Sequence, residues 1–241
     1  MAGSALFASC TAQAFRPGLV RAAQRLGHDL GLAPVVPPQT CCGLPAWDAG
    51  QVEAARAAAR RFVTVFAPYG TVLTLSPACR RMVCQHIPAL LAGEPEAGAA
   101  TALAERVWTW PTFLVERVGL ERLELRFAGR IAYFPACTGE DETAMRAILG
   151  RIAGAEPTTD LPRRCCGYGL NLVWRHPELS RAMAEPVLLA LRLSGAERVL
   201  TDEVGCLVHL LAQRRRGAVP VLQHLVEFLA DPDCCRIRPE G

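Results

Sequence analysis

The tripeptide Cys41-Cys42-Gly43 returns 124 residues later as Cys165-Cys166-Gly167, and this repeat decides how the chain is organised. A further cysteine precedes each copy, at a gap of 30 residues in the first half and 27 in the second. Another follows each copy, at gaps of 35 and 38 residues. These flanking cysteines are Cys10 and Cys79 in the first half and Cys137 and Cys206 in the second. A pattern repeated at a fixed period indicates a duplicated structural unit.

Short apolar runs alternate with longer helical stretches in both halves. Runs near residues 4–9, 71–76, 130–134, 198–202 and 218–222 have the length and composition of buried strands. Residues 49–67 and 177–194 have helical spacing, and Pro68 and Gly195 end these two helices. Strands that alternate with helices are typical of parallel sheets. The sequence therefore predicts an α/β fold with two duplicated parallel-sheet domains related by pseudo-twofold symmetry.

The same elements predict the domain boundaries. We expect the first repeat at residues 1–92 and the second at residues 130–230. Residues 93–129 would connect them, with a helical patch at residues 108–118. The last residues, 231–241, show no periodicity and are expected to form a polar tail.

Composition excludes several classes of function. The net charge of +3 is too small for a nucleic-acid-binding surface, and no apolar run reaches the roughly 18 residues that span a bilayer. The first residues do not resemble a secretory signal, so we expect a cytoplasmic protein. All 26 basic residues are Arg, which excludes Schiff-base and P-loop chemistry. In a reducing compartment, 11 clustered Cys indicate metal binding or redox chemistry rather than disulfides.

Four cysteines in each half have the chemistry of a metal site. Thiolates are soft ligands that suit iron–sulfur clusters or zinc, and the carboxyl ends of parallel strands meet at one sheet edge. Adjacent cysteines suit a multinuclear cluster better than a single zinc ion. We expect helices to begin at or soon after Cys79 and Cys206. The eight candidate ligands are Cys10, Cys41, Cys42, Cys79, Cys137, Cys165, Cys166 and Cys206.

Two copies of this pattern resemble the cysteine-rich CCG domain family. The family includes the B subunit of heterodisulfide reductase, the iron–sulfur subunits of glycolate oxidase and anaerobic glycerol-3-phosphate dehydrogenase, and lactate-utilisation protein A. The stretches that carry the resemblance are Gln39–Gly50, Cys165–Gly169, His176–Met183, Cys206–His209 and Gln223–Ala230. The resemblance implies one 4Fe–4S cluster in each repeat.

Two departures narrow what the resemblance implies. Ser76 and Glu203 stand where the reductase has a fifth cysteine, which favours an ordinary cubane cluster over a noncubane one. The chain also has no Cys-x-x-Cys segment of the kind that glycolate oxidase subunits carry. A stand-alone double repeat resembles the lactate-utilisation members. The resemblance to these members implies an electron-transfer subunit of a complex that oxidises L-lactate to pyruvate. It also implies two partners, a ferredoxin-containing B-type subunit and a third subunit.

Other functions stay open at this point. The chain could be a thiol/disulfide redox subunit like the reductase, or a subunit of another 2-hydroxy-acid oxidase such as glycolate oxidase. It could also be a zinc-bound structural or assembly module, and zinc in one half is possible. We find no Gly-x-Gly-x-x-Gly fingerprint for a flavin or nicotinamide, so we expect electron transfer rather than hydride chemistry in this chain.

Several residues near the cysteines are candidates for supporting roles. Gly43 and Gly167 would let the backbone approach the cluster, and Ser76 lies near a candidate ligand in the sequence. His209 follows Cys206 by three residues, so it could donate to a sulfur or serve as an ordinary helix histidine. The cysteines outside the repeat are Cys84, expected on a helix, and Cys234 and Cys235, expected as an exposed pair.

Overall fold

The computed structural model describes residues 3–38, 41–158, 161–214 and 220–238. Gln39 and Thr40, which begin the first family-like stretch, lie outside these residues, as do residues 239–241 of the expected tail. The chain divides into unit 1, Met1–Trp110, and unit 2, Pro111–Gly241. Both units are α/β with parallel strands, which confirms the predicted fold class.

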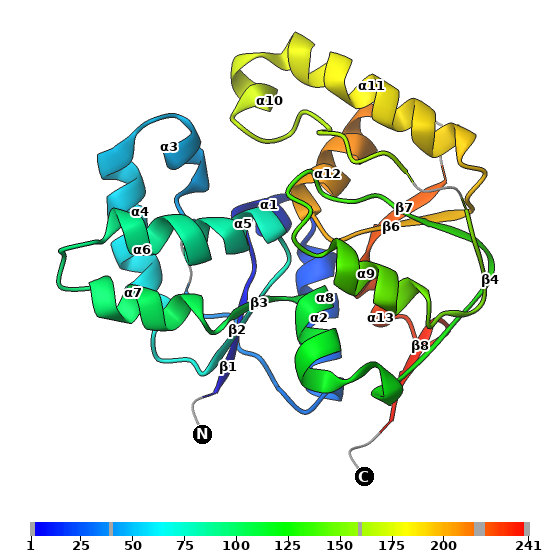
Figure 1. Cartoon of the computed structure of the whole chain (residues 1–241), viewed down its shortest axis with the longest axis horizontal. Helices are drawn as coiled ribbons and strands as arrows, with labels where there is room; N and C mark the ends of the chain where they lie inside the picture. Colours follow the sequence, from blue (N-terminus) through cyan, green and yellow to red (C-terminus); the bar gives the residue numbers. More distant parts are fainter. Residues whose placement is uncertain (1–2, 39–40, 159–160, 215–219, 239–241) are drawn as a thin grey trace. The chain divides into compact units, whose positions relative to one another are not determined.

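Unit 1 contains a parallel sheet in the order β1-β2-β3 (Figure 1). Its strands are β1 (Ser4–Phe7), β2 (Thr71–Thr74) and β3 (Val107–Thr109). On the free side of β1, Ala5 forms an isolated parallel bridge with Val35. The first two strands occupy the predicted runs, but β3 was expected to be the start of a helical patch.

The helices of unit 1 follow these strands along the chain. They are α1 (Cys10–Phe15), α2 (Pro17–Asp29), α3 (Leu44–Asp48), α4 (Val52–Phe66), α5 (Pro77–Arg81), the π-helical turn η1 (Met82–His86), α6 (Ile87–Leu90) and α7 (Ala97–Ala104). The longest of them, α4, is the helix predicted before Pro68.

Unit 2 repeats the strand order of unit 1 and adds to it. Its parallel path is β5-β4-β6-β7, so β4, β6 and β7 correspond to β1, β2 and β3. A further strand, β8, pairs antiparallel with the beginning of β4. The strands are β4 (Leu123–Tyr133), β5 (Ala153–Pro157), β6 (Arg198–Thr201), β7 (Val221–His224) and β8 (Cys235–Ile237).

The remaining helices belong mainly to unit 2. They are α8 (Trp110–Phe113), the π-helical turn η2 (Leu114–Val118), the 3-10 turn η3 (Leu120–Arg122), α9 (Glu142–Leu149), α10 (Leu172–Arg175), α11 (Pro177–Leu193), α12 (Val204–Gln213) and α13 (Leu225–Leu229). Figure 1 shows α11 in yellow, lying along α12 in orange. Helix α11 is the helix that the sequence predicts over residues 177–194, before Gly195. None of the described helices is long and apolar enough to cross a membrane.

The long helices α4 and α11 bury the same positions in their two units. In α4 the buried residues are Ala55, Ala59, Phe62, Val63 and Phe66. In α11 they are Ser180, Ala184, Val187, Leu188 and Leu191, with identical spacing. This spacing places them on one face of a helix, which packs on the unit's core. The duplication seen in the cysteines therefore extends to the core helices, and Ser180 corresponds to Ala55.

The polar tail expected after residue 230 is partly a strand. Residues 235–237 pair with Leu123–Leu125, and Arg126 N donates to Cys234 O at 2.9 Å. As a result, Cys234 and Cys235 are buried, and the expectation of an exposed pair was wrong. A three-residue strand has no detectable period, so no pattern in the sequence indicated this pairing.

Candidate metal centres

The first sulfur group consists of Cys10, Cys41, Cys42 and Cys79. Cys10 begins α1 three residues after β1, and Cys79 lies in α5, which starts three residues after β2. Because β1 and β2 are neighbouring parallel strands, their carboxyl ends bring these two cysteines to one edge of the sheet. Cys41 and Cys42 come from the loop before α3. Cys42 and Cys79 are buried, Cys41 is half-buried and Cys10 is exposed.

The second sulfur group consists of Cys137, Cys165, Cys166 and Cys206. Cys137 lies in the loop after β4, and Cys206 lies in α12, which follows β6. These strands are again parallel neighbours. Cys166 and Cys206 are buried, Cys165 is half-buried and Cys137 is exposed. In both units, therefore, the first cysteine of the repeat is exposed, the second is half-buried and the last two are buried.

Thiol hydrogen bonds join the members of each group. In the first group, Cys41 interacts with Cys10 and Cys42, and Cys42 also interacts with Cys79. In the second group, Cys137 interacts with Cys165. The Cys166 thiol donates to Cys206 Sγ at 3.2 Å. The structure thus brings together the four cysteines predicted in each repeat, as one linked set in unit 1 and as two adjacent pairs in unit 2.

These hydrogen bonds separate the pKa values of the thiols. Bonds with Cys10 and Cys42 lower the pKa of Cys41 to about 3. The bond with Cys137 lowers the pKa of Cys165 to about 6. The pKa values of Cys10 and Cys137 are raised, first by these same bonds and then by burial. Each group therefore favours a thiolate at the first cysteine of its tripeptide, and a thiolate is the form that binds metal.

A glycine amide supports this thiolate in each unit. Gly43 N donates to Cys41 Sγ at 3.5 Å, and Gly167 N donates to Cys165 Sγ at 3.4 Å. Both glycines are in the left-handed region, at φ +93° and +86°. A Cβ on Gly167 would lie 2.6 Å from Ser180 O, closer than real contacts allow. The tripeptide needs glycine for its backbone shape and for its packing.

The residues at the missing fifth-cysteine positions cap the helices that carry the last ligand candidates. Ser76 Oγ accepts from Cys79 N at 3.2 Å. Glu203 Oε1 accepts from Gly205 N at 3.0 Å. Because of these caps, α5 and α12 begin two residues before Cys79 and Cys206, not at or after them as expected. Ser76 and Glu203 thus position the last cysteine of each group.

His209 connects the second tripeptide to α11. Its Nε2 lies 3.2 Å from Ser180 Oγ, and that hydroxyl donates to Gly167 O at 2.8 Å. The ring also bonds the backbone of Ser180 and Cys166, while burial lowers the pKa of His209 and favours the neutral imidazole. His209 therefore holds the backbone of the tripeptide through Ser180. Sequence reasoning missed Ser180, although its place on the apolar face of α11 marks it as buried.

Buried carboxyl groups lie near the second sulfur group. Asp141 and Asp202 are almost completely buried, and Tyr133 Oη donates to Asp202 Oδ1 at 3.3 Å. Burial raises the pKa of Asp202, and the charges of Asp141 and Glu203 raise it further. Glu203 also contributes to the raised pKa values of Cys137 and Cys206. The position in unit 1 that corresponds to Asp202 is the buried Leu75.

The three cysteines outside the repeat have separate surroundings. The Cys84 thiol donates to Ala104 O at 3.3 Å. Arg198 Nη1 donates to Cys234 Sγ at 3.2 Å, and burial raises the pKa of Cys234. Cys235 is buried at the start of β8. These contacts place Cys84, Cys234 and Cys235 in helix and strand packing.

The donor chemistry of the two groups fits iron–sulfur clusters. Each group offers four thiols from three separate segments, with a glycine amide donating to one sulfur. Thiolates of this number suit 2Fe–2S and 4Fe–4S clusters, and such amide–sulfur bonds adjust the potential of a cluster. Among the described residues, no three Cys, His, Asp or Glu side chains are already arranged around one point as ligands of a single ion.

Known proteins match both the sequence and the fold. The profile of the cysteine-rich CCG domain matches residues 4–83 and 131–211. The chain is 29% identical over 236 residues to lactate utilization protein A 1 of Bacillus mycoides (strain KBAB4), covering 93% of this chain and 95% of the relative. It is 28% identical over 234 residues to lactate utilization protein A of Geobacillus thermodenitrificans (strain NG80-2), covering 93% and 97%.

A solved structure has the same fold at low sequence identity. It is the crystal structure of a hypothetical protein from Helicobacter pylori, with a TM-score of 0.65 and 13% identity. The match covers 95% of this chain and 48% of that one. The profile match takes in both Cys-Cys-Gly tripeptides and both sulfur groups. The chain therefore belongs to the family of proteins built from the cysteine-rich CCG domain.

Proposed function

We propose that this chain is an iron–sulfur electron-transfer subunit of a complex that oxidises L-lactate to pyruvate. The observation that carries the proposal is the gathering of four thiols in each unit, with a lowered thiol pKa at Cys41 and at Cys165. A bound cluster would accept and release single electrons. The choice of lactate as the substrate rests on the names of the relatives, which are lactate utilization proteins.

The proposed ligands are the eight cysteines of the two sulfur groups. One 4Fe–4S cluster would be held in each unit, by Cys10, Cys41, Cys42 and Cys79 in unit 1 and by Cys137, Cys165, Cys166 and Cys206 in unit 2. Two thiols of each group are buried and would exclude water from one side of a cluster. The exposed thiols, Cys10 and Cys137, leave the other side accessible.

The partners and the compartment form part of the same proposal. Two clusters pass electrons but do not remove a hydride from lactate, so the oxidation itself requires another subunit. We propose a ferredoxin-containing B-type subunit and a third subunit as the partners, in the cytoplasm. The relatives' name, lactate utilization protein A, supports a chain that acts together with other subunits.

Metal and sulfide analysis of anaerobically purified protein tests the proposal. We expect about four iron and four sulfide per sulfur group, and an EPR signal after reduction. Protein that is colourless and holds only zinc would contradict the electron-transfer function. A cluster signal that changes when a disulfide substrate is added would favour thiol/disulfide chemistry instead.

Serine substitutions test the ligand set. Cys42→Ser and Cys166→Ser each remove a buried thiol of a different group, so each should lower the iron and sulfide content by about half. Cys84→Ser and Cys235→Ser are matched controls, one in each unit, and should leave iron unchanged. Full iron content in both Cys42→Ser and Cys166→Ser would refute the ligand assignment.

A further inference from the structure

The outer face of α11 carries a second row of apolar residues in addition to its buried face. The row consists of Leu179, Ala182, Pro186, Leu189 and Leu193, spaced by three and four residues alternately. Leu179, Leu189 and Leu193 are 51%, 48% and 76% exposed. This spacing is the a/d pattern of helices that pack against another helix. We call this row the α11 stripe.

The stripe is not required by the fold. The matching helix α4 of unit 1 buries the same positions, yet Arg61 and Thr64 stand where the centre of the stripe has Pro186 and Leu189. Trp174 and Leu170, in and just before the neighbouring α10, are exposed apolar residues as well. Apolar surface of this extent on a single element is typical of an interaction site.

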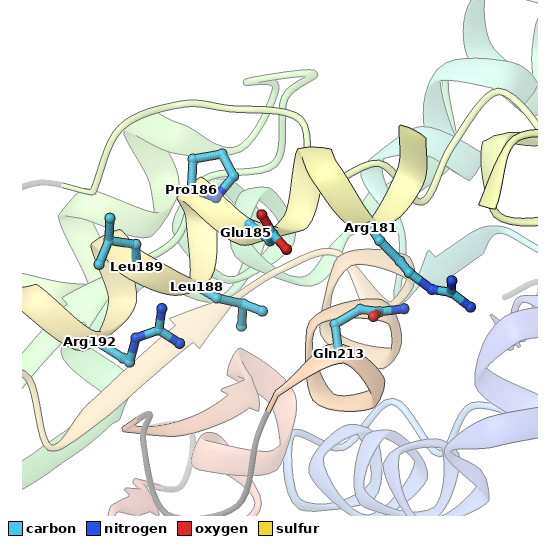
Figure 2. Close-up of a pocket in the computed structure, with 7 residues that line it drawn as sticks. All are labelled: Arg181, Glu185, Pro186, Leu188, Leu189, Arg192 and Gln213. Carbon is cyan, nitrogen blue, oxygen red and sulfur yellow. The ribbon is translucent and has the colours of Figure 1, made fainter. Parts of the chain in front are cut away.

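A charged groove runs along one side of the stripe. It has a volume of about 760 Å³ and lies against α11 and the end of α12. Figure 2 shows Pro186 and Leu189 on one side of α11, with Arg181 and Gln213 drawn near each other beyond it. Arg181, Glu185 and Arg192 all line the groove. The flank of the stripe therefore carries both signs of charge.

We propose that the α11 stripe is an interface between two copies of this chain, with their α11 helices packed antiparallel. A twofold axis makes such an interface self-complementary. If Pro186 of one copy packs beside Leu189 of the other, Glu185 of each copy faces Arg192 of the other. Within the described residues, neither Glu185 nor Arg192 forms an ion pair. Each is therefore available to the second copy.

The mixed charges favour this occupant over a lipid surface. Helices that bind anionic membranes carry a predominantly basic polar face. The α11 flank instead alternates, with Glu178 and Glu185 as well as Arg181 and Arg192. A helix with both signs along one flank is complementary to its own reversed copy.

The oligomeric state of the full chain tests the interface. Light scattering and sedimentation of the anaerobically purified protein should give twice the 26.0 kDa of one chain. Leu189→Glu should weaken association at least about 100-fold, because it places a carboxylate in the apolar contact of both copies. Val52→Glu is the matched control, since Val52 is similarly exposed, at 43%, on the helix that corresponds to α11. It should leave the dimer intact.

Charge reversal tests the antiparallel register. In a dimer of the Glu185→Arg variant, both contacts between positions 185 and 192 join two positive charges. In a dimer of the Arg192→Glu variant, both contacts join two negative charges. Each variant alone should therefore weaken association about tenfold. A mixture of the two variants restores both attractions, so it should form a heterodimer as stable as the original dimer. A monomeric natural chain at about 100 µM would overturn the proposal. So would a dimer that Leu189→Glu leaves intact, or a mixture that associates no better than its components.

Discussion

Units 1 and 2 present their four thiols from corresponding positions along the chain, yet they surround them with different chemistry. In unit 1 the residues around Gly43 are apolar, since Ala55 and Met82 lie against it. In unit 2 the corresponding residues are Ser180 and His209, which form a hydrogen-bonded set with Gly167. The comparison shows that backbone shape and thiol position are common to both repeats. The residues packed around the tripeptide can be polar or apolar without a change in backbone shape or thiol position.

A second difference concerns charge. The cap before the last cysteine is a neutral Ser76 in unit 1 and a carboxylate, Glu203, in unit 2. Asp202 adds a second buried carboxyl group, where unit 1 has Leu75. The charge of Glu203 opposes the addition of an electron, so a cluster in unit 2 would be reduced at a lower potential than one in unit 1. Two clusters of unequal potential give electrons a preferred direction.

The largest expected contrast between the units comes from the two tripeptide glycines. In Gly167→Ala the new Cβ meets Ser180 O at 2.6 Å and Met183 Cβ at 3.0 Å. In Gly43→Ala the nearest atom is Ala58 Cβ at 3.2 Å. Both substitutions carry left-handed strain of about 1–2 kcal/mol, and the clash should raise the loss at Gly167 to about 3 kcal/mol or more. Differential scanning calorimetry of the full chain measures both.

The control for this comparison is Gly169→Ala. Gly169 is outside the left-handed region, and nothing lies within 4 Å of an added Cβ. It should therefore change the melting temperature little. Equal losses at Gly43 and Gly167 would mean that packing around the two tripeptides is alike, contrary to the contacts described.

A smaller contrast is expected from the polar set of unit 2. Ser180→Ala removes the hydroxyl that joins Gly167 O to His209 Nε2, and should destabilise unit 2 by about 1–2 kcal/mol. The double variant Ser180→Ala/His209→Met copies Ala55 and Met82 of unit 1. The loss in unfolding free energy of the double variant should be smaller than the sum of the losses of the two single variants. The reason is that the double variant has no buried imidazole left without its hydroxyl partner. Strict additivity in calorimetry would contradict this coupling.

The smallest expected effect depends on pH. The folded state raises the pKa of Asp202 above the ordinary value of about 3.9, so folding favours the protonated carboxyl group. Its stabilising contribution is fully present below that ordinary value and is lost as the pH rises through the folded pKa. Asp202→Asn should therefore stabilise unit 2 by about 1 kcal/mol at pH 8, and the gain should vanish near pH 4.

Melting curves of Asp202→Asn and the natural chain across this pH range provide the measurement. Asp29→Asn, at an exposed position in unit 1, is the matched surface control. A gain from Asp202→Asn that grows toward low pH would reverse the assigned direction of the shift.

The features whose sequence pattern is clear in both halves could be predicted from the sequence, and those with a weak pattern or none could not. The sets of four cysteines, α4 and α11 carry patterns that can be checked against a second copy. In contrast, β3 is only Val107–Thr109 and its apolar residues run on into a helix, so periodicity could not separate them. The interaction of Ser180 with His209 was also beyond prediction, because spacing indicates which residues are buried but not which partners they find.

The pairing of β8 with β4 sets an order for folding during synthesis. Leu123 pairs with Ile237, so the β4–β8 pairing in unit 2 is complete only when nearly the whole chain has left the ribosome. The strands of unit 1 lie entirely within its first 109 residues and are available much earlier. The nascent chain can therefore shape its first four-thiol group while the second is still being translated, and metal could be loaded one unit at a time.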